Sequence, residues 1–125
     1  MTARDAAHAH LAKAREYLEA AEVTRELSLY NAATSNAVTS GINAKDAICL
    51  KLTGRTNKAD NHDEARAELR AAGPIGRTLE PTLARLLRLK SRAQYQQTSV
   101  TKSDAAKAVN WATCLFESAQ EVVSS

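Results

Sequence analysis

Small apolar residues recur along this sequence at intervals of three and four, which is the spacing of one face of an α-helix. The first stretch shows the pattern most regularly, at Ala7, Leu11, Ala14, Leu18 and Ala21. Later stretches repeat it, and no segment sustains the alternation of a β-strand. Aromatic residues make up only 4% of the chain, so its core must consist mainly of small and aliphatic side chains, which favour closely spaced helices. The pattern predicts an all-α fold, an antiparallel bundle of about five helices.

Helix start and stop signals divide the chain into the expected elements. The helices are expected from Thr2 to about Arg25, from Ser28 to about Thr53, from Asp60 or Asn61 to Gly73, from between Arg77 and Pro81 to about Tyr95, and from Thr101 into the C-terminal stretch. The residues numbered 54–61 form the main expected loop, and those numbered 96–100 a shorter connection. A chain of 125 residues suits a single domain, residues 1–125, with one hydrophobic core.

The charge balance is compatible with nucleic-acid binding but does not by itself indicate it. There are 17 Lys and Arg residues against 14 Asp and Glu residues, a net charge of +3, so the position of the cations matters more than their number. No stretch approaches the ~20 apolar residues that span a bilayer, and we expect a cytoplasmic protein without membrane association.

The cysteines and two of the histidines do not form a metal site in the sequence. Cys49 and Cys114 are far apart and both fall at apolar helix positions, so we expect buried free thiols rather than a disulfide. His8 and His10 are two residues apart and therefore point to different sides of a helix, where we expect surface positions. No phosphate-binding glycine loop is present, and neither a metal nor another cofactor is expected.

Several short stretches, in this order and spacing, resemble the HEPN family of helical-bundle proteins. They are Tyr30-Asn-Ala-Ala33, Ala44-Lys-Asp-Ala-Ile48, His62-Asp-Glu-Ala65, and Leu86-Leu87 through Arg92-Ala-Gln-Tyr95. The resemblance covers most of the chain. It implies a compact bundle, commonly a homodimer, often encoded beside a nucleotidyltransferase or acting in toxin-antitoxin and defence systems.

The resemblance also implies a possible reaction, because catalytic HEPN proteins are metal-independent ribonucleases that use an Arg followed after four to six residues by a His. Arg55 and His62 have six residues between them and fit this spacing. His62 would accept the proton of the RNA 2′-hydroxyl and Arg55 would hold the phosphate. The pair spans the loop before the third helix, whereas family members carry it near the later helices. The alternative is that His62 only occupies a first helical turn and Arg55 is a solvated loop residue.

The fourth expected helix carries the densest positive charge in the sequence. Arg85, Arg88 and Arg92 recur at three and four residues and Tyr95 follows, so all four share one side of the helix. Such a stripe could contact RNA phosphates, with Tyr95 stacking on a base. The alternative is an ordinary solvent-exposed face opposite the leucines.

Three functions follow as hypotheses. The first is an RNA-binding or RNA-cleaving HEPN module. The second is a non-catalytic module that binds a nucleotide or a protein partner such as a nucleotidyltransferase or an antitoxin. The third is a structural homodimer that uses an alanine-rich face.

Overall fold

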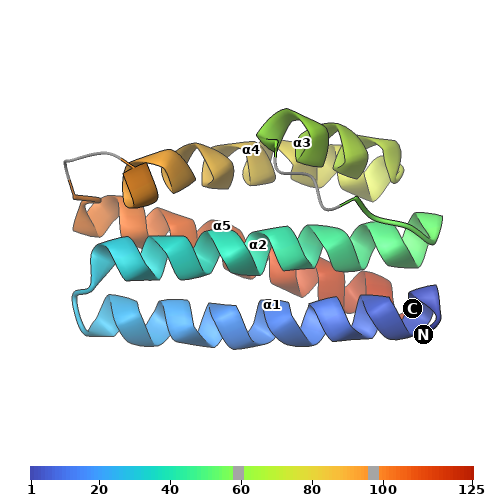
Figure 1. Ribbon diagram of the computed structural model, residues 1–125, viewed down its shortest axis with the longest axis horizontal. Helices are drawn as coiled ribbons and strands as arrows, with labels where there is room; N and C mark the ends of the chain where they lie inside the picture. Colours follow the sequence, from blue (N-terminus) through green and yellow to red (C-terminus); the bar gives the residue numbers. More distant parts are fainter. Residues whose placement is uncertain (58–60, 96–98) are drawn as a thin grey trace.

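The computed structural model describes residues 1–57, 61–95 and 99–125, with the side chains of Gln94 and Tyr95 left aside. These residues form five α-helices and no strand, as the sequence predicts. The helices are α1 (Ala3–Glu26), α2 (Tyr30–Thr53), α3 (His62–Ala71), α4 (Pro74–Tyr95) and α5 (Lys102–Ser124). The long helices run side by side and the short α3 lies outside them, next to α4 (Figure 1).

Helix α2 is the centre of the bundle, because it packs against each of the other four helices. Helices α1 and α4 both pack on α2 and on α5, but they do not pack on each other within the described residues. Part of the surface of α2 therefore lies between α1 on one side and α3 with α4 on the other. None of the described helices combines the length and apolar character needed to cross a membrane.

Three of the expected helix starts are confirmed by their hydrogen bonds. Thr2 forms a reciprocal capping box with Asp5, Asn61 accepts from the amides of Asp63 and Glu64, and Thr101 accepts from the amide of Asp104. The expected end of α2 is also confirmed, because Gly54 follows it with φ of 79° in the left-handed region. Asp60, the other candidate cap of α3, lies outside the described residues.

Two of the expected helix starts are wrong. Ser28 does not cap α2, since it adopts φ of 62° in the turn and the cap position falls on Leu29, which makes no side-chain cap bond. Helix α4 begins at Pro74, earlier than the expected Arg77 to Pro81, and Pro81 lies inside it. A proline has no N–H to leave unpaired, so Pro74 suits the first helical position.

Small residues allow the helices to approach closely, as the composition predicts. A Cβ atom on Gly41 of α2 would overlap a methyl of Leu86 on α4, and one on Gly76 would overlap the carbonyl oxygen of Leu69 on α3. Cys49 is buried, as expected, but Cys114 is exposed, which corrects the expectation for that thiol.

Candidate functional site

A network of charged side chains lies beneath α3, at its contact with α2. Lys45 of α2 is 1% exposed, and its Nζ lies 2.6 Å from Oδ1 of Asp46 and 2.8 Å from Oε1 of Glu68 on α3. The hydroxyl oxygen of Thr56 lies 2.7 Å from Oδ1 of Asp46 and 2.6 Å from Oε1 of Glu68, and its hydrogen can be donated to either carboxylate. The amide of Asn57 donates to the other oxygen of Glu68 at 2.9 Å. The network fixes the chain after α2 and the middle of α3 on the bundle.

Hydrogen bonding outweighs burial in setting the protonation of this network. Burial alone would lower the pKa of Lys45, but its bonds to Asp46 and Glu68 raise the pKa above its ordinary value. Burial alone would raise the pKa of Glu68, but bonds from Lys45, Thr56 and Asn57 lower the pKa below its ordinary value. Both groups are therefore held in their charged forms.

His10 of α1 extends the network toward the surface. Its Nδ1 lies 2.9 Å from Oδ1 of Asn43 and 3.8 Å from Oδ2 of Asp46, and its side chain is 26% exposed. His8 is exposed as expected, but His10 is held between α1 and α2, which corrects its expected surface position. This network was not predicted from the sequence, although two adjacent charged residues, Lys45 and Asp46, interrupt an apolar stretch and are the signal that could have indicated it.

Arg55 and His62 lie on different sides of α3. Arg55 is exposed and lines a hollow together with Glu64, Ala67 and Ala71. These three α3 residues lie on the side of the helix opposite His62, because each is rotated by roughly 140–200° from it at 100° per residue.

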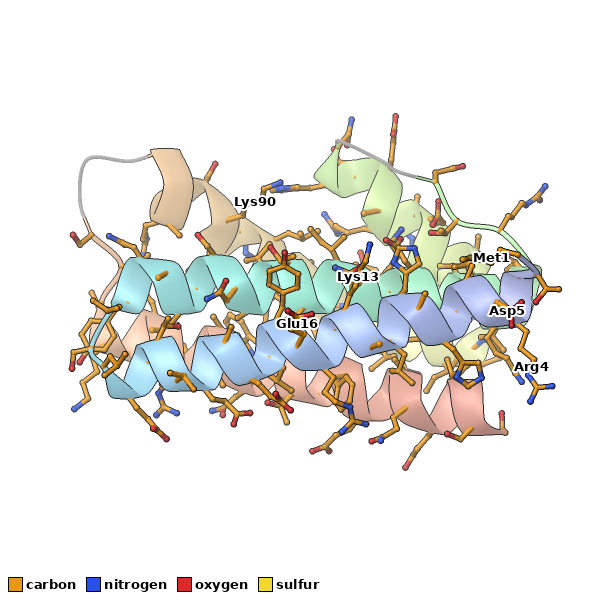
Figure 2. All side chains as sticks on the ribbon, turned by 60° about the horizontal axis from the view of Figure 1, so that its bottom comes forward. Met1, Arg4, Asp5, Lys13, Glu16 and Lys90 are labelled. Carbon is orange, nitrogen blue, oxygen red and sulfur yellow. The ribbon has the colours of Figure 1, made fainter. Side chains whose placement is uncertain are left out.

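His62 instead lies close to Lys90 of α4. Partial burial lowers the pKa of His62 below its ordinary value, and the positive charge of Lys90 lowers it further, against the opposing effect of Asp63. Lys90 projects from the C-terminal half of α4 (Figure 2). Lys90 is therefore a cation of the same chain whose charge acts on His62.

The arginines of α4 form an exposed basic stripe. Arg85 and Arg88 are exposed and have no carboxylate partner among the described residues, whereas Arg92 donates to Oδ2 of Asp104 at 2.7 Å. Burial alone would raise the pKa of Asp104, but hydrogen bonds from Arg92 and Thr101 hold it below its ordinary value. The backbone of Tyr95 belongs to α4, but its side chain lies outside the described residues.

The acidic residue of α4 does not neutralise this stripe. Glu80 is turned toward α3, where its Oε1 accepts from Nε of Arg66 at 2.7 Å and from Nη1 of Arg70 at 2.8 Å. It is the only carboxylate in the α4 sequence. Arg77, one of the exposed residues of the same helix, adds a further cation without a described ion-pair partner.

Helix α5 adds a cation and an aromatic ring beside the stripe. Lys107, Trp111 and Cys114 follow Asp104 at spacings of three, four and three, so they share the side of α5 on which Asp104 contacts Arg92. Lys107 is exposed and Trp111 is half-buried against the core. We call Arg77, Arg85, Arg88, Arg92, Lys107 and Trp111 the basic face.

The fold defines the class of protein as a small all-α domain. The described parts of the chain contain no group of three His, Cys, Asp or Glu side chains placed to hold a metal ion. The HEPN domain family matches residues 7–122, so the chain belongs to the HEPN family. A comparison with curated proteins finds no match.

Proposed function

We propose that this HEPN domain binds single-stranded RNA across the basic face of α4 and α5. The observation that carries the proposal is the set of exposed arginines Arg77, Arg85 and Arg88, which have no carboxylate partner among the described residues. Guanidinium groups bind phosphates through paired charged hydrogen bonds, and arginines that share one side of a helix can contact several phosphates of one strand. Trp111, and Tyr95 as predicted from the sequence, would supply stacking surfaces for bases.

Fluorescence anisotropy with a labelled oligouridylate tests this proposal. The double variant Arg85→Gln/Arg88→Gln should bind on the order of tenfold more weakly and reduce the slope of log affinity against log salt by about 1.4, or ~0.7 for each lost phosphate contact. The matched control is Arg4→Gln/Arg25→Gln, which removes the same charge from exposed positions on α1. Equal losses of RNA affinity in the two double variants would mean that only net charge matters, and would contradict a defined binding face.

A second candidate function is metal-independent RNA cleavage with His62 as the proton acceptor. The lowered pKa of His62 favours this reading, because the imidazole is then neutral at pH 7 and can take a proton, while Lys90 offers positive charge for the phosphate. Arg55 lies on the other side of α3, so its joint action with His62 would need a homodimer in which one protomer supplies each residue.

Incubation with mixed RNA in EDTA tests cleavage directly. Fragments with cyclic phosphate ends should appear with the wild type and disappear with His62→Ala, while His8→Ala, an exposed histidine on α1, should leave cleavage unchanged. Unaltered cleavage by His62→Ala would remove His62 from the mechanism. Intact RNA with the wild type would favour a non-catalytic module, and co-purification would then test a nucleotidyltransferase or antitoxin partner.

A further inference from the structure

The imidazole of His10 is held in one orientation and one neutral form by α2. The side-chain amide of Asn43 donates from Nδ2 to the carbonyl oxygen of Thr39 at 2.9 Å, which leaves its Oδ1 to accept from Nδ1 of His10 at 2.9 Å. Asp46 lies on the same edge of the ring, 3.8 Å from Nδ1. Because Nδ1 carries the hydrogen, the lone pair of the neutral ring is on Nε2.

The polar residues around His10 are themselves fixed. Asp46 contacts the buried Lys45 and accepts from Thr56, so the carboxylate beside His10 cannot turn freely. Nε2 of His10 has no hydrogen-bond partner among the described residues, and the ring is partly open to solvent. Helix α1 therefore presents a positioned hydrogen-bond acceptor.

Two further side chains follow His10 along the same side of α1. Lys13 and Tyr17 come three and seven residues later, which places them in line with His10 over roughly 10 Å of helix. Lys13 is exposed and Tyr17 is 38% exposed. Figure 2 shows Lys13 on α1 beside α2, with Glu16 about one turn further along. Lys13 makes no ion pair with Glu16 or with any other described residue.

We propose that His10, Lys13 and Tyr17 form a ribonucleotide contact on α1 in which Nε2 of His10 accepts a hydrogen bond from a ribose 2′-hydroxyl. A ribonucleotide matches the three side chains, since its hydroxyl donates, its phosphate pairs with a cation and its base stacks on an aromatic ring. DNA lacks the hydroxyl and leaves Nε2 without a partner. This contact rests on the proposed RNA binding and makes His10 the residue that distinguishes RNA from DNA.

The test compares an oligouridylate with the oligodeoxyuridylate of the same length, which differ only in the 2′-hydroxyl. Wild-type protein should bind the RNA about three- to tenfold more tightly, the range of one hydrogen bond. His10→Ala should abolish this ratio by weakening RNA binding alone, whereas His8→Ala on another side of α1 should preserve it. Lys13→Gln should weaken both oligonucleotides, because both carry phosphates.

The ratio of RNA to DNA affinity distinguishes a specific role of His10 from a structural one, because a misfolded His10→Ala variant would lose affinity for both oligonucleotides equally. Equal wild-type affinity for RNA and DNA, or an unchanged ratio in His10→Ala, would overturn the assignment even if the Arg85/Arg88 variant confirms the basic face. If His10→Ala changes the ratio of RNA to DNA affinity but Arg85→Gln/Arg88→Gln leaves RNA binding unchanged, the His10 contact is supported and the basic face is rejected. No binding of either oligonucleotide would overturn both.

Discussion

Nζ of Lys45 on α2 lies 2.8 Å from Oε1 of Glu68 on α3, and the Lys45 side chain in this ion pair is only 2% exposed, whereas that of Glu68 is 16% exposed. Glu68 also accepts hydrogen bonds from Thr56 and Asn57, so this one carboxylate of α3 binds the segment that follows α2. Helix α3 is therefore held on the bundle by this ion pair and by the apolar contacts that its residues Ala65 and Leu69 make with the core. The attachment of α3 to the bundle is therefore partly electrostatic.

Lys45→Met should destabilise the protein by about 3 kcal/mol, because it leaves the largely buried Asp46 and the partly buried Glu68 without their cation. Urea denaturation followed by circular dichroism measures the change. Lys13→Met, at an exposed position of α1, should change the free energy of unfolding by less than about 0.5 kcal/mol. Similar effects of the two substitutions would mean that the buried pair contributes nothing specific.

Glu68 should make unfolding sensitive to acid. Its pKa in the folded protein lies below the ordinary 4.5, so its stabilising contribution is present above pH 4.5 and is lost as the pH falls through the lowered folded value. Glu68→Gln should therefore flatten the decline of the unfolding free energy below pH 4.5. Glu19→Gln, at an exposed position of α1, should keep the wild-type decline. Parallel curves for wild type and Glu68→Gln would exclude this contribution.

Alanine at Gly76 should be much more damaging than alanine at Gly41. The new methyl at Gly76 would meet the backbone carbonyl of Leu69, which cannot turn away, and we expect a loss above about 3 kcal/mol. The methyl at Gly41 would meet the ends of the Leu86 and Leu115 side chains, which can shift, and alanine also favours the helix by roughly 1 kcal/mol. Thermal denaturation ranks the two variants. A larger loss for Gly41→Ala would contradict the close contact between α3 and the start of α4.

The two thiols should differ widely in reactivity. Cys49 is buried next to Glu68, and burial raises the pKa of its thiol to about 12, so little reactive thiolate forms at pH 8. Cys114 is exposed. Ellman's reagent should therefore titrate one thiol in the folded protein and a second only after denaturant is added, and Cys114→Ser should remove the first. Rapid reaction of both thiols in the native protein would show that α3 does not cover Cys49.

Local signals in the sequence predicted most of the fold because they act through neighbouring residues. Thr2, Asn61, Thr101 and Gly54 each terminate or start a helix through bonds within a few positions, and the structure confirms them. Ser28 was wrongly predicted to start α2 because serine commonly caps helices, whereas the tight turn between α1 and α2 places this residue at positive φ.

The candidate site was harder to predict because its contacts join distant segments. His10 meets Asn43 and Lys45 meets Glu68 only after α1 and α3 pack on opposite sides of α2. The helical spacing of Arg85, Arg88 and Arg92 could be read directly, but the salt bridge that engages Arg92 comes from α5. The spacing of Arg55 and His62 fitted a sequence rule, yet spacing across a loop does not determine on which side of α3 each side chain lies.

Trp111 gives the molecule a built-in optical probe. It is the only tryptophan in the chain and lies half-buried at the edge of the basic face, so its emission depends on what covers that part of α5. A base stacked on the indole would quench it, whereas a ligand held only by His10, Lys13 and Tyr17 of α1 would leave the indole without a stacked base. Unlabelled protein can therefore distinguish occupancy of its two proposed contact regions by intrinsic fluorescence alone.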